Sequence, residues 1–545
     1  MAADFEALVD EWIKKELEES PIRASSLGID GYDDLLGDYS TAGFERRDRA
    51  DDDWLKRLHD VDESTLSFEQ RIDLGLLRST VTGRKINQTW LGWRRDPGMY
   101  ANVGLQGVFA LFLHRVHEEA DLARFAIARM QALSGVLEDG KKNIDPDLVP
   151  PLFVERAAGP CRAGIGYFRN LVPQEIADDK LRRELAEAGD AAATALESYL
   201  GWLDELAPKA KGDWVFGETR YSALLQEKEV LAFNTEGLNG LGHSAFDTVE
   251  RELNEVAARL DASSDWRTIN KRLTEDHPPS PDDMRAAYEA CTAKARQFLI
   301  DHELVTLATG EQCLVEPSPP FQRPVLAVAS YATPPAFKPT LTGHFFVPFP
   351  PDGTSEAEVQ QRLATNSFHM IPTITAHEAY PGHHWHLTWM QGNERRLRKM
   401  HTTPYFSEGW GLYAERVMYE HGFFTSDEEV LGHLDARIFR AARIIVDTSL
   451  HTGEMSPDDA VKFMTSNTAL SEATAVAEVK RYCAWPTQAA SYLTGCLEIE
   501  RIRQQFLDAN RGTLRDFHDR LAGAGALPIG LAERAVLAGA EDEDA

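Results

Sequence analysis

The first 310 residues repeat one pattern, in which apolar side chains recur three and four positions apart and charged residues fill the spaces. Phe5, Leu8, Val9 and Trp12 illustrate it near the N-terminus. This spacing lines up apolar side chains on one face of an α-helix. The pattern predicts helices that include Phe5–Glu19, Phe68–Val81, Leu105–Asp139, Lys180–Leu206, Ser244–Leu260 and Pro281–His302. No repeat of fixed length is present, so a solenoid is not expected.

The pattern changes near residue 313. Val325–Ala329 and His344–Pro348 are short apolar runs bounded by proline-containing segments, which is typical of β-strands. They predict a small β-sheet or hairpin at about residues 313–350 in a mainly α fold. We expect the 545 residues to form a single large helical domain, 1–545. In it, residues 1–310 form a helical shell, and residues 311–545 carry the strands and the functional side chains.

Charge and composition limit the partners and the cellular location. The net charge is −30, with 87 acidic against 57 basic residues, which argues against nucleic acid and anionic membranes as partners. No run approaches the length of uninterrupted apolar sequence that spans a membrane. Met1–Glu6 lacks the features of a signal peptide, and the 5 cysteines are scattered, as in proteins with reduced thiols. We expect a cytoplasmic protein; its oligomeric state stays open.

The stretch Ile374–His386 reads ITAHEAYPGHHWH. A His-Glu pair followed by further histidines offers imidazole ligands for zinc and a carboxylate beside metal-activated water. The regular motif H-E-x-x-H places both histidines on one helix face, but here Pro381 occupies the second histidine position. A proline inside a helix removes a hydrogen bond and clashes with the preceding turn. Pro381 and Gly382 therefore predict a local bulge or break.

The position of the second ligand depends on this break. In a regular helix His377 and His383 would point about 120° apart, and His377 and His384 would be separated by about 10 Å of rise. A bulge that absorbs two residues would bring His383 to the second ligand position. We expect His377 and His383 to bind the metal, with His384 in reserve, and Glu378 to act as general base. The alternative is a histidine-rich helix end with a structural Pro-Gly kink.

A third ligand is available in the helical segment Tyr405–Glu415. Glu408 lies 30 residues beyond Glu378, which leaves room for one helix and a return. A carboxylate on a neighbouring helix is how one class of zinc enzymes completes a site of two histidines and one glutamate. Glu415 shares a helix face with Glu408 and could orient a ligand or serve as a reserve ligand. Solvation is the default for an isolated glutamate, but the aromatic and small neighbours indicate a packed face.

Two further groups could take part in catalysis or substrate binding. Arg443, Asp447 and His451 recur every four residues, a spacing that supports an ion-pair ladder. His451 at its end could face the metal cleft, and a structural role is equally consistent with the spacing. Tyr331, between the predicted strands, is a candidate substrate contact.

The segment Arg481–Gly495 contains Pro486, which suits the first turn of a helix. That helix would display Gln488 and Tyr492 on one side. The Tyr492 hydroxyl could donate to the oxyanion of a tetrahedral intermediate; the alternative is a core position. We expect Gln488 and Arg481 to contact substrate.

The segments His377–His384, Ser407–Glu415 and Pro486–Gly495 together resemble the bacterial domain-of-unknown-function family 885 over nearly the whole chain. Its members are described as mostly helical proteins of zincin character. The layout is more distantly similar to carboxypeptidase Taq and the thimet-type oligopeptidases. These resemblances imply a large multi-helix zincin-like peptidase fold, favour His383 over His384, and place a substrate-binding tyrosine region roughly at Gln488–Tyr492. The departure is the two-residue expansion of the motif.

The residues and the resemblance together predict a zinc-dependent metallopeptidase acting on short peptides. Zinc, or another divalent metal, would be held by His377, His383 and Glu408, with Glu378 as general base. Tyr492 or His451 is the expected oxyanion stabiliser. Two alternatives stay open. One is a metal-dependent hydrolase of a non-peptide amide or ester, and the other is a degenerate zincin scaffold without catalysis.

Overall fold

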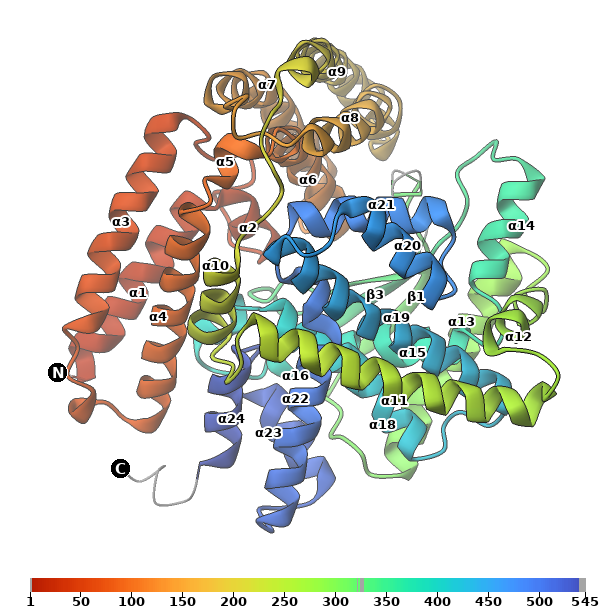
Figure 1. The fold of residues 1–545 in the computed structure, drawn as a ribbon. Coiled ribbons are helices and arrows are strands. Elements are labelled where there is room, and N and C mark those ends of the chain that lie inside the picture. Colours follow the sequence, from red (N-terminus) through yellow and green to blue (C-terminus); the bar gives the residue numbers. More distant parts are fainter. Residues whose placement is uncertain (1, 321, 324–327, 539–545) are drawn as a thin grey trace.

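A computed structural model describes residues 2–320, 322–323 and 328–538. These residues form a predominantly helical molecule with a small three-stranded sheet, so the prediction of a mainly α fold with a small sheet is confirmed (Figure 1). Within these ranges, no helix combines the length and apolar character needed to cross a bilayer.

The elements up to residue 301 are all helical. They are α1 (Ala2–Glu19), α2 (Pro21–Ser26), α3 (Thr41–His59), η1 (Glu63–Thr65), α4 (Phe68–Gln88), α5 (Gly92–Arg95), α6 (Gly98–His114), α7 (Glu119–Asn143), α8 (Pro151–Gly166), η2 (Tyr167–Leu171), η3 (Val172–Glu175), α9 (Asp179–Leu206), η4 (Ala207–Lys209), α10 (Glu218–Ala223), η5 (Leu224–Lys228), α11 (Thr235–Asp261), α12 (Trp266–Leu273) and α13 (Pro281–Asp301).

The strands come next, followed by the helices that build the site. These elements are β1 (Gln312–Pro317), β2 (Ser330–Ala332), β3 (Thr342–Val347), α14 (Glu356–Thr365), α15 (Ile371–Glu378), α16 (His383–Met390), α17 (Arg396–Met400), α18 (Pro404–Glu420), α19 (Asp427–Thr452), α20 (Pro457–Asn467), α21 (Glu472–Ala484), α22 (Gln488–Asp508), α23 (Leu514–Gly523) and α24 (Ile529–Leu537).

One predicted helix is divided in two in the structure, and others extend beyond their predicted bounds, as α4 and α11 do. The single helix expected over Leu105–Asp139 is wrong, because α6 ends at His114 and α7 begins at Glu119. Arg115 adopts a left-handed backbone conformation with φ of 43°, and its guanidinium pairs with the Glu175 carboxylate. The break contains no glycine or proline, so apolar periodicity runs across it without a local stop signal.

Polar caps set many of the helix starts. The Ser67 side chain accepts a hydrogen bond from the amide of Gln70, whose side chain bonds back to the Ser67 amide. Such a capping box satisfies backbone groups that a helix end leaves unpaired. At α18 the side chain of Thr403 accepts from the amide of Tyr405, and Pro404 occupies the first turn. The helix that carries Glu408 therefore begins at a fixed point.

The sheet has the strand order β1-β3-β2. β2 and β3 pair antiparallel, with Tyr331 opposite Phe345, whereas β1 pairs with β3 in parallel, with Cys313 opposite Gly343. The structure thus contains a mixed sheet in place of a simple hairpin. Of the predicted strand Val325–Ala329, residues 325–327 lie outside the described residues.

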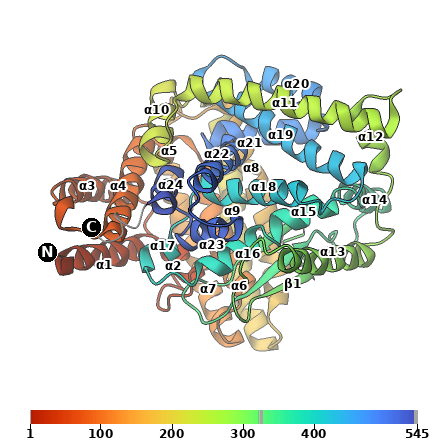
Figure 2. The same ribbon diagram turned by 90° about the horizontal axis from the view of Figure 1, so that it is seen from below.

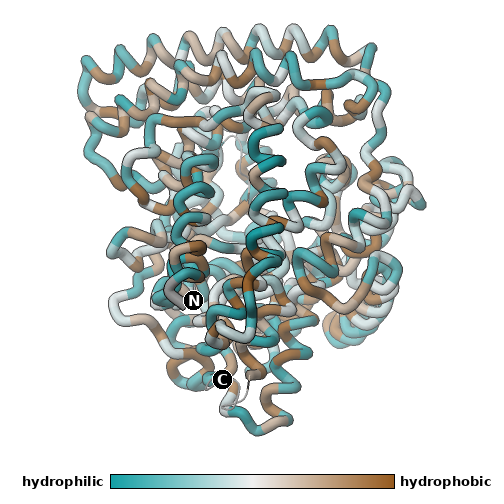
Figure 3. Tube along the Cα trace, turned by 90° about the vertical axis from the view of Figure 1, so that its left-hand side faces the viewer, coloured by the Kyte–Doolittle hydropathy of each residue, from teal (hydrophilic) through white to brown (hydrophobic). Residues whose placement is uncertain are grey.

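The core helices α18 and α22 approach each other closely at glycines. α18 packs along α22, where a β-carbon added to Gly409 would lie 2.6 Å from the Cα of Gly495. Seen from below, α18 lies between α15 and α22 (Figure 2). Hydrophobic and hydrophilic residues alternate along the helices on the N-terminal side, as amphipathic packing requires (Figure 3). Close contact between α15, α18 and α22 brings distant parts of the sequence to one place.

Candidate metal centre

The His-Glu segment is broken where the sequence predicts. α15 ends at Glu378, the Tyr380–Pro381 peptide bond is cis, and α16 begins at His383. A β-carbon added to Gly382 would lie 1.8 Å from the carbonyl oxygen of His377. Only glycine therefore fits, because the chain folds back against the end of α15.

This return brings two histidines and one glutamate together. The Nε2 atoms of His377 and His383 each lie 3.5 Å from Oε2 of Glu408. The two imidazole rings are 4.8 Å apart between centroids, with their planes at 87°. One ligand atom from each of the three residues lies within 4.8 Å of the other two. We refer to His377, His383 and Glu408 as the metal cluster.

The cluster has the dimensions of a zinc site. Two ligand atoms bonded to one zinc ion at 2.0–2.1 Å and at a tetrahedral angle lie about 3.3–3.4 Å apart. Two of the three separations, at 3.5 Å each, agree with this value, and the third is at most 4.8 Å. Two imidazoles and one carboxylate are also a ligand set of catalytic zinc sites, which leave one position open. The cluster therefore fits a divalent zinc ion.

α18 is shaped to receive the His377 ring. A β-carbon added to Gly411 would lie 2.6 Å from Cε1 of His377, so the absence of a side chain there makes room for the imidazole. Trp410 on the same helix donates from Nε1 to the carbonyl oxygen of Pro381 at 2.8 Å. This bond ties the break between α15 and α16 to the helix that carries Glu408.

A second buried carboxylate supports the first histidine. Glu415 accepts a hydrogen bond from Nδ1 of His377 at 2.8 Å and another from the Thr373 hydroxyl at 2.8 Å. Nδ1 of His433, on α19, lies 3.5 Å from the same carboxylate. Ligating histidines in metal proteins commonly donate their other ring nitrogen to a carboxylate in this way. Glu415 occupies this supporting place: it contacts the metal cluster through Nδ1 of His377 and is not one of the three residues grouped as ligands.

The electrostatics of the cluster favour cations. Burial opposes ionisation of Glu408 and of Glu415, yet hydrogen bonds from the histidines hold the pKa of each carboxyl well below its usual range. Burial also disfavours charge on His377, but hydrogen bonds to Glu408 and Glu415 raise its pKa to about 10. The negative charge that retains a proton on Nε2 equally attracts a divalent cation, which would displace that proton.

Glu378 differs from the other acidic residues of the site. Burial raises the pKa of its carboxyl above the ordinary value; charge on His383 and His377 opposes this rise, and the carboxylates Glu408 and Glu415 add to it. Among the described residues, no hydrogen bond to its carboxylate is present. An unbonded carboxylate with a raised pKa, adjacent in sequence to a cluster member, is available to accept a proton from water.

His384, the reserve ligand, belongs to a different network. Its Nε2 lies 2.7 Å from Oε2 of Glu311, and its Nδ1 lies 3.0 Å from the Tyr331 hydroxyl. Glu311 also accepts hydrogen bonds from Tyr380 and from Arg296. Both ring nitrogens of His384 are therefore engaged away from the metal cluster. Tyr331, a predicted substrate contact, instead bonds this buried histidine.

His451 is placed in the core. Its Nε2 lies 3.1 Å from the carbonyl oxygen of Tyr482, and its Nδ1 accepts from the amide of Phe216 at 3.3 Å. Its ring packs against Phe216 and Tyr221. Both ring nitrogens are bonded to backbone groups and the side chain has no exposed surface, so neither nitrogen is free to donate to an oxyanion in this structure. The expected role of His451 as an oxyanion stabiliser is therefore not retained.

Tyr492, Gln488 and Arg481 form one group of contacting side chains, and their roles at a substrate stay predictions. The Gln488 amide donates to the Tyr492 hydroxyl at 3.4 Å, and Arg481 donates to the Gln488 carbonyl oxygen. The guanidinium carbon of Arg443 lies 4.8 Å from the centroid of the Tyr492 ring. No hydrogen bond joins Tyr492 to the metal cluster in the described part of the chain.

Sequence reasoning missed several partners of the site. Glu311 bonds His384, whereas Thr373 and His433 contact Glu415; Glu311 lies far upstream and His433 on a later helix. None of them has a local pattern that marks its role. The glycines of the segment Gly409–Gly411 did carry a signal, because small residues on a helix next to aromatic ones indicate close packing.

Comparison with known proteins shows the family and the fold. A candidate lipoprotein of unknown function from Shewanella oneidensis is similar with a TM-score of 0.80 and 20% identity, covering 98% of this chain and 100% of that chain. A candidate lipoprotein from Colwellia psychrerythraea is similar with a TM-score of 0.78 and 18% identity, covering 95% and 96%. At these identities the likeness shows a shared fold alone. No curated protein matches the chain. Residues 21–536 match the model of a family described as bacterial protein of unknown function (DUF885), and the chain belongs to that family.

Proposed function

We propose that the protein is a zinc-dependent metallopeptidase that hydrolyses short peptides. The observation that carries the proposal is the convergence of His377, His383 and Glu408, from three helices, on one point. Two imidazoles and a carboxylate match the ligand set of hydrolytic zinc enzymes. The adjacent, unbonded Glu378 supports a hydrolytic role over a purely structural metal site, because a structural site needs no free carboxylate.

The residues have separate tasks in this proposal. His377, His383 and Glu408 would hold the ion, and a bound zinc ion supplies Lewis-acid activation of water and of a carbonyl oxygen. Glu378 accepts the proton of the attacking water and returns it to the leaving amine. Glu415 keeps the His377 imidazole oriented through Nδ1. Tyr492 is the side chain proposed to donate to the oxyanion.

The expected cytoplasmic location stays a prediction. The two similar structures belong to proteins described as candidate lipoproteins, and at 20% and 18% identity they do not decide the location of this chain.

A paired measurement tests the proposal. Purified wild-type protein and Glu378→Gln are loaded with zinc, their metal content is measured by mass spectrometry, and both are incubated with a broad peptide library. We expect both to carry one zinc ion, and only the wild type to cleave peptides. A zinc-loaded wild type that cleaves no peptide would overturn the peptidase proposal. Cleavage of amide or ester compounds alone would point to a non-peptide hydrolase.

A further inference from the structure

We propose that Arg440 binds a carboxylate of the substrate, in a subsite that it forms with Arg443 and Tyr492 beside the metal cluster. The substrate class is thereby narrowed to peptides that present a carboxylate close to the bond that is cut. The inference deepens the proposed peptidase function and rests on it.

The contacts of α19 with α22 fix the level of Arg440 in the fold. Arg437 pairs with Glu500 at 3.0 Å, and Arg443 lies over the Tyr492 ring at 4.8 Å. Residue numbers rise along α19 while they fall along α22, so the two helices run antiparallel. Arg440 lies between these contacts and therefore near the middle of the 492–500 segment, and its guanidinium carbon is 6.0 Å from the centroid of the Tyr492 ring.

The metal cluster lies at nearly the same level. Gly495 packs on the backbone of α18 at Gly409, the residue that follows Glu408. Farther along, Arg503 of α22 pairs with Glu420 of α18 at 2.7 Å, so these two helices run parallel. Glu408 therefore lies close to the level of Gly495 along α22, and so does Arg440 of α19. Burial raises the pKa of the Glu415 carboxyl, but hydrogen bonds from His377 and His433 hold it below its usual range. The charge of Arg440 lowers it further.

The Arg440 guanidinium forms no salt bridge or hydrogen bond with a carboxylate within the described residues, although its charge favours the ionised forms of Asp435 and Glu415 nearby. Its Nη1 donates to the carbonyl oxygen of Ala436 in its own helix at 3.0 Å, and its Nε is buried with no hydrogen-bond acceptor. The neighbouring arginines Arg437 and Arg443 each pair with a glutamate. A half-buried guanidinium without a directly bonded carboxylate is costly, and an incoming anion would relieve that cost.

The surroundings of Arg440 are cationic and held in place. Arg443 and Arg481 share a single carboxylate, Glu478, at 2.7 and 2.9 Å. Arg440 and Arg443 both lie against the Tyr492 ring, and the one carboxylate bonded within this pair, Glu478, is shared with Arg481. The Tyr492 ring is fixed between Arg443 and the Gln488 amide. The subsite is therefore preformed and attracts negative charge.

The chemistry of the ligand follows from the guanidinium. Its planar pair of N–H groups matches the two oxygens of a carboxylate and binds it by charge-assisted hydrogen bonds. In a peptide, such a group is either the C-terminal carboxylate or the side chain of aspartate or glutamate. Both sources share one chemistry, and the experiment separates them.

Binding is measured by calorimetry on zinc-loaded Glu378→Gln protein, which lacks the proposed general base and should leave the peptide intact. The probes are acetylated tetra-alanine as the free acid, acetylated tetra-alanine amide, and an acetylated Ala-Glu-Ala-Ala amide. We expect at least one carboxylate-bearing probe to bind about tenfold or more tightly than the neutral amide. Preference for the free acid assigns the subsite to the C-terminus, and preference for the glutamate peptide assigns it to an acidic side chain.

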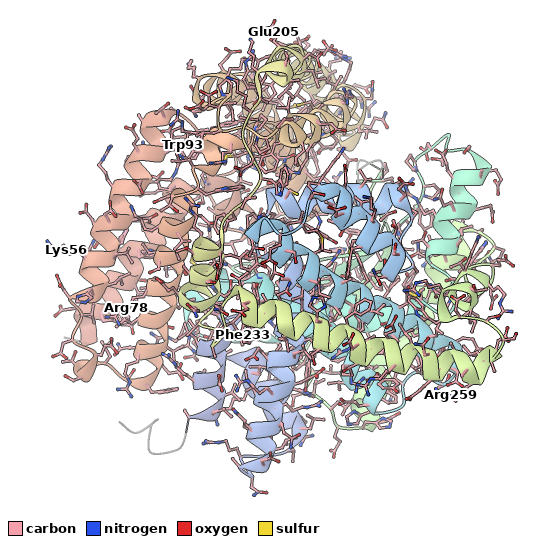
Figure 4. All side chains as sticks on the ribbon, viewed as in Figure 1. Lys56, Arg78, Trp93, Glu205, Phe233 and Arg259 are labelled. Carbon is pink, nitrogen blue, oxygen red and sulfur yellow. The ribbon has the colours of Figure 1, made fainter. Side chains whose placement is uncertain are left out.

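Adding Arg440→Gln should abolish this preference, whereas Arg440→Lys should keep part of it because the charge remains. Arg259→Gln is the matched control; Arg259 lies on the outer end of α11 and pairs with Asp427 (Figure 4). The control should retain the full preference. Thermal unfolding of each variant checks that it is folded. Equal affinity for all three probes, or a preference that survives Arg440→Gln, would overturn the proposal.

Kinetics of the wild type distinguish the two proposals. If peptides are cleaved, Arg440→Gln should raise KM for the preferred probe about tenfold and change kcat little. If no peptide is cleaved but the binding preference depends on Arg440, the peptidase proposal fails and the carboxylate subsite stands. If peptides with and without a carboxylate are cleaved equally, the subsite fails and the peptidase proposal stands.

Discussion

The Nδ1 atom of His377 lies 2.8 Å from Oε1 of Glu415, a carboxylate that is 2% exposed. Because an ionised carboxylate only accepts hydrogen bonds, the proton must reside on Nδ1. Once a divalent cation displaces the proton on Nε2, neutral His377 offers the lone pair of that nitrogen as a ligand. A residue outside the metal cluster thus selects the tautomer that a metal ligand needs.

Glu415→Gln should weaken zinc binding about 10–100-fold, which is the usual cost of losing such a supporting carboxylate. A glutamine can still bond His377 but does not carry the charge that raises ligand basicity. Affinity is measured by competition with a chromophoric chelator. Glu420→Gln, on the same helix and paired with Arg503, serves as the control. Equal zinc affinities in the two variants would contradict the role assigned to Glu415.

Gly411→Ala should lower both stability and zinc affinity. The added β-carbon would lie 2.6 Å from the His377 ring and must displace it, at a cost of about 1–3 kcal/mol in the free energy of unfolding. Gly240→Ala on α11 is matched to it, because a β-carbon there meets nothing within 4 Å. That control should gain about 0.5–1 kcal/mol. Urea unfolding measures the stability and chelator competition measures the zinc affinity. If Gly411→Ala changes neither, the close contact is excluded.

His383 and His384 should respond differently to substitution. His383→Ala removes a member of the metal cluster and should abolish stoichiometric zinc binding. His384→Gln keeps a side chain that can bond Glu311 and Tyr331, and should keep its zinc while losing some stability. Zinc content after dialysis separates the two. Loss of zinc from His384→Gln with retention in His383→Ala would reverse the ligand assignment.

Much of this site follows from the local sequence. Pro381 and Gly382 predict the end of a helix, and the structure shows why, since any side chain at 382 would collide with the His377 carbonyl. The apolar periodicity likewise predicts most helices of the shell. What local patterns do not contain is the identity of tertiary partners. Glu311, for example, bonds His384 from a distant segment. The proposed role of Arg440 depends on the register of α19 against α22.

Asp447 should make the protein less stable as the pH rises. Burial raises the pKa of its carboxyl to about 7, against bonds from Tyr221 and Thr487 that lower it. In the unfolded chain the pKa is about 3.9. The folded state therefore holds the proton more tightly, and this stabilisation is present below about pH 4 and lost as the pH rises to about 7.

Asp447→Asn does not titrate and should lack this decline. The free energy of unfolding of the variant, minus that of the wild type, should therefore rise between about pH 4 and pH 8. Urea titrations at several pH values measure the difference, in which the other titrating groups largely cancel. Parallel pH profiles for the two proteins would show that Asp447 is ionised in the folded state at all these pH values.

The most direct test of the metal centre is a crystal structure of the zinc-loaded protein with anomalous data collected at the zinc edge. We predict one strong anomalous peak about 2.0–2.2 Å from Nε2 of His377, from Nε2 of His383 and from a carboxylate oxygen of Glu408. A peak elsewhere, or none at the metal cluster in zinc-saturated crystals, would contradict the assignment of these three side chains to a metal ion.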